Sequence, residues 1–168
     1  KKYFFRPRAM RLINFNSNII INLQEPRWNS CSINMARKVL KICRMQRYGI
    51  SIVLSNDKQM RYLNHKWKGK NKPTNVLSFP SKNIIPDTKF KRQYLGDIIL
   101  GYETLKKESR YGNVLFINHM SHLLIHGILH LKGYAHDNRV NEKFMQTEEI
   151  RILKILNISN PYKSNRLI

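Results

Sequence analysis

Residues 126–136 read HGILHLKGYAH, and three of these eleven residues are histidines. On a helix, His126 and His130 stand four residues apart, so both imidazole rings leave the same face about one turn apart. Gly133 can adopt the left-handed conformation that ends a helix, and the chain can then fold back and bring His136 beside the first two rings. Three neutral imidazoles with an open fourth position are the usual ligand set of a catalytic zinc ion. The segment therefore predicts a zinc site at the end of a helix.

A histidine-rich helix without a metal is the alternative for this segment. His119 and His122 lie near the same helical face, and we expect them to pack or to hydrogen-bond, because the helix break selects the downstream set. The spacing is also that of the metzincin proteases, which need a glutamate directly after the first histidine as general base. That position holds Gly127, so peptide hydrolysis by this mechanism lacks its base.

The composition is strongly basic. The 168 residues contain 31 Lys+Arg against 10 Asp+Glu, which gives a formal net charge of +21. Residues 1–100 carry 21 of the basic and 4 of the acidic residues. This balance favours a polyanionic partner, either nucleic acid or an anionic membrane surface. An AT-rich genome would account for part of the excess, and the 20 Ile and only 3 Ala of the chain are the bias expected of such a genome.

The cysteine count and the apolar segments indicate in which cellular compartment the protein is expected. Cys31 and Cys43 are too few for a disulfide framework or a cysteine-rich zinc site. With no recognisable signal peptide, we expect a protein of the reducing cytoplasm. The best candidate for a membrane span, 114–131, is interrupted by histidines and other polar residues, so a transmembrane helix is excluded.

Hydrophobic periodicity predicts strands at 18–23, 50–54, 75–79 and 95–100, and helices at 32–47, 56–67, 102–110, 115–132 and 141–156. Two polar, basic segments at 68–73 and 81–94 are predicted loops. Strands come mostly early and helices late. We therefore expect an α+β fold, a single domain over 1–168 with a mixed four-stranded sheet, several helices and a zinc cleft.

The histidine segment resembles the signature H-G-x-L-H-L-x-G-Y-D-H of the YbeY family of bacterial endoribonucleases. Ten of the eleven positions match, and Ala135 stands where the family has Asp. Other stretches similar to the family's blocks are NKPTNVLSFP at 71–80, LGDI at 95–98, Met145 with Glu149, and NPY at 160–162. The matched blocks span roughly 60% of the chain, from about residue 63 to about residue 162.

The resemblance implies one zinc ion held by His126, His130 and His136. It also implies a single-strand-specific endoribonuclease that acts in maturation of small-subunit ribosomal RNA and in ribosome quality control. The expected partners are ribosomal RNA and the small ribosomal subunit, with no membrane and no small-molecule cofactor. The family has a functionally important Arg where this chain has Lys68, so the positive charge is kept and the planar bidentate fork is lost.

Four alternating lysines beside Trp67, here called the lysine rim, are Lys66, Lys68, Lys70 and Lys72. Next to a hydrolytic zinc site, we expect Lys68 to act in catalysis by neutralising developing charge on the phosphate. We expect the other three to bind substrate phosphates. A solvated loop with a buried Trp is the alternative. Further candidates for this rim are Lys82, Lys89, Lys91 and Arg92.

Two questions stay open at this level. Asp97 can hold a ligand histidine through a hydrogen bond or cap a turn, and no residue is an evident general base. Zinc-dependent cleavage of RNA is the expected function. The alternative function is a non-catalytic, zinc-containing, RNA-binding ribosome-assembly factor, which would explain the charge, Lys68 and Ala135. A metalloprotease is disfavoured by Gly127.

Overall fold

A computed structural model describes residues 11–16, 18–81 and 93–163. Within them, one mixed sheet contains β1 (Arg11–Asn16), β2 (Ile19–Leu23), β3 (Gly49–Ser55), β4 (Val76–Pro80) and β5 (Tyr94–Gly101). The strand order is β1-β2-β3-β5-β4. The three central strands β2, β3 and β5 are parallel, while β1 and β4 pair antiparallel at the two edges.

The helices of the described residues are α1 (Ser30–Ile42), α2 (Asp57–Lys68), α3 (Tyr102–Tyr111), α4 (Phe116–Leu131) and α5 (Arg139–Ile155), with a 3₁₀ turn at Met45–Arg47. Asparagine side chains cap three of them. Asn29, Asn56 and Asn138 each accept a hydrogen bond from a backbone N–H in the first turn of α1, α2 and α5. These caps satisfy donors that a helix start leaves unpaired.

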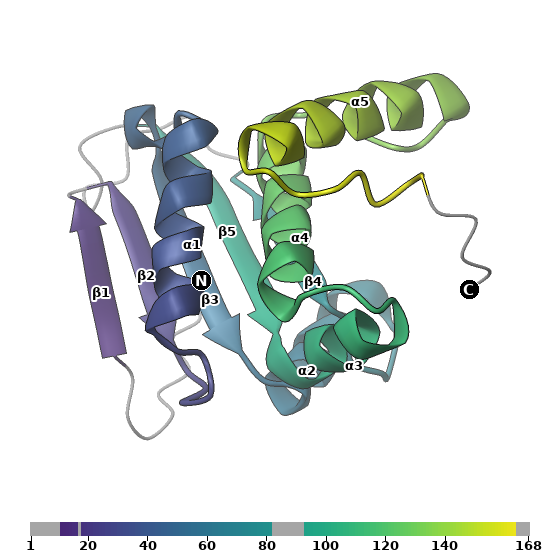
Figure 1. The fold of residues 1–168 in the computed structure, drawn as a ribbon. Coiled ribbons are helices and arrows are strands. Elements are labelled where there is room, and N and C mark those ends of the chain that lie inside the picture. Colours follow the sequence, from purple (N-terminus) through teal and green to yellow (C-terminus); the bar gives the residue numbers. More distant parts are fainter. Residues whose placement is uncertain (1–10, 17, 82–92, 164–168) are drawn as a thin grey trace.

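The expected α+β class with a mixed sheet is confirmed, but the four-stranded count is wrong. The additional strand is β1, whose sequence RLINFN mixes three apolar residues with one Arg and two Asn. It lacks the β-branched run that identified its partner β2 (Figure 1). As an edge strand, β1 has a neighbour on one side only, so its sequence needs less apolar character.

The first predicted helix is also too long. Its periodicity continues to residue 47, yet α1 ends at Ile42 because Arg44 adopts the left-handed conformation, with φ of 56°. Met45, which follows α1, is buried in the 3₁₀ turn. Most of the predicted loop at 81–94 falls on residues 82–92, which lie outside the described residues, and Tyr94 already belongs to β5.

Two apolar layers flank the sheet. The larger layer joins one face to α1 and α4, which lie side by side in Figure 1, and it contains Ile52, Ile98 and Leu100 from the strands. The smaller layer joins the other face to α2 and is built around Met60, Leu77 and Ile99. Alternate residues of β5 thus face different helices, as strand geometry requires. The histidine-rich helix α4 is therefore held against the sheet along its length.

In the described part of the chain, no single helix is long and apolar enough to cross a membrane. The pair α3 and α4 reaches the required length only together, with a bend of 117° between the two helices.

Close approach of β4 to β5 requires a glycine at position 96. Gly96 has φ of +142°, and a Cβ there would lie 2.1 Å from the carbonyl oxygen of Phe79. Gly133 also has a positive φ, +91°, but a Cβ there would meet nothing within 4 Å. A side chain at position 96 would meet both backbone strain and a steric clash, whereas one at position 133 would meet backbone strain alone.

We predict that Gly96→Ala lowers the free energy of unfolding by at least about 2 kcal/mol, because strain and clash add. Gly133→Ala should lower it by only about 1 kcal/mol, since strain acts alone. Urea denaturation followed by circular dichroism measures both changes. Equal losses for the two variants would contradict the close approach at Gly96.

Candidate metal centre

Three histidines converge at the carboxyl end of α4. The Nε2 atoms of His126 and His130 are 3.0 Å apart. The chain leaves α4 through a turn at Gly133 and returns with His136, whose ring lies 4.9 Å from that of His130 between centroids. One ligand atom from each of these three residues, here called the histidine cluster, lies within 4.8 Å of the other two.

The donor set fits a single transition-metal ion. Zinc–imidazole bonds are about 2.0–2.1 Å long, so two nitrogens that share one ion lie at most about 4.2 Å apart. The 3.0 Å between the Nε2 atoms of His126 and His130 is within that limit. The structure brings the three predicted ligands together, and within the described residues no other group of three or more His, Cys, Asp or Glu does the same. Three protein ligands are the usual number in catalytic zinc sites, which keep a fourth position for water or substrate.

Hydrogen bonds at the far side of two rings fix which nitrogen faces the others. The Nδ1 atom of His126 is 2.8 Å from Oε1 of Glu149. The Nδ1 atom of His130 is 3.0 Å from the carbonyl oxygen of Tyr134. Both partners are acceptors, so Nδ1 carries the proton in each ring and Nε2 presents its lone pair toward the cluster.

Glu149 lies on α5 and is 1% exposed. Its carboxylate accepts hydrogen bonds from His126, from His122 at 3.1 Å and from the hydroxyl of Tyr162. Burial alone raises the pKa of this carboxyl, but the three donors outweigh burial and lower the pKa to about 2. Burial and the adjacent Glu149 both raise the pKa of Tyr162, so its hydroxyl remains a donor.

Burial also keeps His130 in the form that binds metals. Desolvation lowers the pKa of His130, and the neighbouring His126 lowers it further. A neutral imidazole is the ligating species, so the environment favours coordination by His130 near neutral pH.

The other histidines of α4 hydrogen-bond, as predicted. Nε2 of His119 lies 2.8 Å from Glu108 of α3, and His122 contacts Glu149. Asp97 does not serve the cluster. In β5 it alternates with Ile98, which faces α4, and it is paired in register with Phe79, which packs in the α2 layer.

Ala135 and Asp137 lie after the turn at Gly133, close to the position where the family signature has an Asp that this chain lacks. Ala135 follows Tyr134, whose backbone carbonyl orients His130, so that contact does not depend on the side chain at 135. Asp137 accepts a hydrogen bond of 2.7 Å from Asn141 in the first turn of α5. It therefore supports the start of α5 and does not replace the missing Asp.

Gly127 faces the sheet. A Cβ at this position would lie 3.0 Å from Cγ2 of Ile98 and 3.1 Å from Oγ of Ser78. A glutamate here would point into the sheet and away from the rings of His126 and His130. The geometry thus agrees with the expectation from sequence that the metzincin mechanism lacks its base.

All four residues of the lysine rim are exposed. Lys66 and Lys68 lie in the last turn of α2, and Lys70 and Lys72 lie in the loop that follows. Trp67 is exposed by 53%, so the buried Trp of the alternative is wrong, while the exposure of the four lysines fits both interpretations. The further candidates Lys82, Lys89, Lys91 and Arg92 lie outside the described residues.

The role of Glu149 in orienting His126 was missed from sequence. One signal was present, because Glu149 shares a helical face with Met145, Ile152 and Leu153, all buried. An acidic residue within an apolar stripe is buried, and a buried carboxylate needs partners.

We predict that Glu149→Gln weakens divalent-metal binding 10- to 100-fold, because an amide cannot accept three hydrogen bonds and so leaves His126 unoriented. The matched control is Glu148→Gln, which changes the neighbouring carboxylate that pairs with Arg151. Zn²⁺ titration against a chelating dye measures both affinities. Equal affinity of the two variants would refute the role assigned to Glu149.

Comparisons with known proteins agree on one family. Residues 13–157 match the family model described as Endoribonuclease YbeY. A protein named Endoribonuclease YbeY from Ehrlichia canis is 44% identical over 115 residues, which cover 68% of this chain and 71% of the relative. One of the same name from Rhizobium johnstonii is 42% identical over 118 residues, 70% of this chain and 68% of the relative.

A solved structure shows the same fold. The solution structure of TM1509 from Thermotoga maritima superposes with a TM-score of 0.54 at 22% sequence identity, over 88% of this chain and 97% of that one. At that identity the likeness concerns the fold alone. On the family model and the identities above, the chain belongs to the YbeY family.

Proposed function

We propose that this chain is a zinc-dependent endoribonuclease that cleaves single-stranded ribosomal RNA during maturation of the small-subunit RNA. The observation that carries the proposal is the convergence of three imidazoles whose Nε2 or other free nitrogens lie within 4.8 Å, in a chain whose relatives are named endoribonucleases. The small ribosomal subunit as partner and a cytoplasmic location belong to the same proposal. The net charge of +21 supports the RNA-containing partner.

His126, His130 and His136 would hold the zinc ion. When bound, zinc supplies Lewis acidity toward a phosphoryl oxygen and makes water more acidic. Glu149 keeps the proton of His126 on Nδ1, and the carbonyl of Tyr134 does the same for His130. Both rings are thereby held ready before metal or substrate arrives, which lowers the reorganisation that catalysis requires.

Lys68 would neutralise charge that develops on the phosphate. Trp67 packs against Phe79, with 5.8 Å between ring centroids, and thereby attaches the end of α2 to β4. Ser78, the residue before Phe79 in β4, faces the other side of the sheet, where it lies against Gly127 of α4. The end of α2 and the metal-binding part of α4 therefore contact opposite faces of the edge strand β4, and Lys68 would reach a substrate at the histidine cluster around the free edge of that strand.

The other rim lysines would hold the RNA backbone. The ammonium of Lys66 lies 5.7 Å and 5.9 Å from the ring centroids of Tyr62 and Trp67. Exposed aromatic rings among cations suit single-stranded RNA, since bases stack on rings while lysines contact phosphates. Lys70 and Lys72 extend the positive charge along the following loop.

We predict that the purified chain holds one zinc ion and that His130→Ala removes both metal and RNA cleavage while RNA binding stays largely intact. The reason is that imidazoles bind the ion and cations bind the RNA. The control is His65→Ala, which removes an exposed histidine of α2 and should retain both. Elemental analysis, cleavage assays and binding assays measure the three properties.

A metal-containing protein that binds RNA without cutting it would support the alternative of a ribosome-assembly factor. Cleavage that persists in His130→Ala at the rate of the unmodified chain would exclude a role for the histidine cluster.

For Lys68 we predict a fall in kcat of at least about tenfold in Lys68→Ala at unchanged zinc content, because a cation beside the scissile phosphate acts in the transition state. Lys68→Arg should keep or raise the rate, since guanidinium binds phosphate in a bidentate manner. The matched control is Lys58→Ala, at the other end of α2. If Lys68→Ala cleaves saturating RNA at the full rate, Lys68 is a surface charge only.

A further inference from the structure

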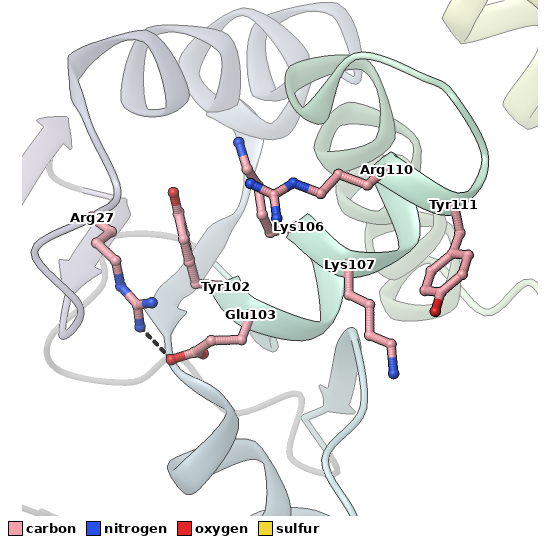
Figure 2. A pocket seen from close by; sticks show the side chains of 7 residues that line it. All are labelled: Arg27, Tyr102, Glu103, Lys106, Lys107, Arg110 and Tyr111. Carbon is pink, nitrogen blue, oxygen red and sulfur yellow. Dashed lines mark hydrogen bonds and ion pairs between the residues drawn. The ribbon is translucent and has the colours of Figure 1, made fainter.

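An open hollow of about 600 Å³ lies along α3, where the parallel strands end (Figure 2). Its lining residues, which define the α3 hollow, come from α3 and from the segment between β2 and α1. The lining contains four cations, two tyrosines and one carboxylate. The hollow lies at the amino end of α4, since Lys106 lies over Phe116, with its ammonium 5.4 Å from the ring centroid. It is separate from the histidine cluster, which lies at the carboxyl end of the same helix.

One wall of the hollow is fixed by ion pairs. The guanidinium of Arg27 pairs with Glu25 at 2.7 Å and with Glu103, and it lies 4.7 Å from the ring centroid of Tyr102. Glu103 also accepts a hydrogen bond of 2.8 Å from the backbone N–H of Asp57. The carboxylate of the hollow is therefore fully engaged, and Arg27 acts as a rigid wall.

The other cations of the hollow are Lys106, Lys107 and Arg110. Among the described residues, no carboxylate forms an ion pair with any of them. Glu103 stands four residues before Lys107, a spacing that often gives an ion pair on a helix, yet it turns to Arg27. Three positive charges are thus presented within about one turn of α3, and none of them is paired with a carboxylate of the described residues.

A tyrosine stands next to these charges. Tyr111, the last residue of α3, is 82% exposed, and its ring centroid lies 5.8 Å from the ammonium of Lys107. In Figure 2, Lys107 and Tyr111 extend from one side of α3, and Arg110 reaches back toward Lys106 on the other. An exposed aromatic ring beside neighbouring cations offers a surface on which a base can stack, next to a surface that can bind phosphate.

We propose that the α3 hollow binds a single-stranded RNA segment that flanks the one cleaved at the histidine cluster. Phosphates of this segment contact Lys106, Lys107 and Arg110, and one base stacks on Tyr111. Along α4, Phe116 is 10 to 14 residues from His126 and His130, which is about 15–21 Å at 1.5 Å per residue. The hollow therefore contacts different nucleotides from those at the metal. This inference rests on RNA as the substrate of the proposed function.

The experiment measures RNA binding in the His126→Ala background, so cleavage does not interfere. The probe is a fluorescent single-stranded RNA of about 20 nucleotides, long enough to cover more than one site. Combined replacement of Lys106, Lys107 and Arg110 by Ala should weaken binding at least tenfold. It should also reduce the slope of log affinity against log salt by about 0.7 for each lost phosphate contact. The control replaces three exposed lysines elsewhere, Lys38, Lys41 and Lys154, and should weaken binding less than about threefold.

Tyr111 tests for base recognition. Tyr111→Ala should weaken RNA binding at least about fivefold, the lower end of measured base stacking, and Tyr111→Phe should restore it. Phe144→Ala is the matched control, because Phe144 on α5 is 66% exposed and lies outside the hollow. Binding of heparin, a polyanion without bases, should not respond to Tyr111→Ala.

Equal losses for the two triple variants, or equal effects of Tyr111→Ala on RNA and heparin, would overturn the proposal. In the cleaving chain, the hollow variants should lower kcat/KM, because remote contacts hold the RNA and also position its scissile phosphate. The two proposals are tested by different measurements. If the chain shows these binding differences but does not cut RNA, the proposed endoribonuclease activity is refuted and the RNA-binding site in the α3 hollow is retained.

Discussion

The buried carboxylate of Glu149 holds together three parts of the chain. It accepts hydrogen bonds from His122 and His126 on α4 and from Tyr162 beyond α5. A buried charge is costly unless it is fully hydrogen-bonded, so removing any donor leaves part of that cost uncompensated. The same bond that satisfies the carboxylate also orients His126 toward its two neighbours. The packing of α5 on α4 and the orientation of His126 therefore depend on the same hydrogen bonds to Glu149, so a change in one changes the other.

Sequence spacing was enough to predict the histidine cluster and insufficient to predict what orients it. His126 and His130 are one helical turn apart, and Gly133 sits where the chain must reverse, so local geometry alone brings the rings together. Glu149 lies 23 residues from His126 along the chain, and only the packing of α5 makes them neighbours. Asp97 was the carboxylate considered from sequence, and the alternation of β5 turns it toward the other face of the sheet.

Similar reasoning explains the errors in the fold. The predicted helix extended to residue 47, but Arg44 adopts a left-handed conformation just after α1, and Met45 is buried in a 3₁₀ turn instead. The strand β1 depends on pairing with β2, and its own mixed polar and apolar sequence does not predict that contact. Charge patterns were equally ambiguous. Lys107 lies four residues after Glu103, a spacing that is typical of an ion pair on a solvated helix face. Only the structure shows that Glu103 pairs with Arg27 instead.

The two departures from the family signature have different physical weight. The substitution at Ala135 leaves His130 oriented by a backbone carbonyl, which no side-chain change removes directly. Lys68 is the larger departure, because an ammonium neutralises a phosphate without the bidentate geometry of a guanidinium. Binding energy from parts of a substrate remote from the reaction can position the reacting group. The α3 hollow would supply such remote contacts at the opposite end of α4. A rigid helix then sets the distance between the two contacts, so an RNA held at both ends needs less specific recognition at the scissile phosphate itself.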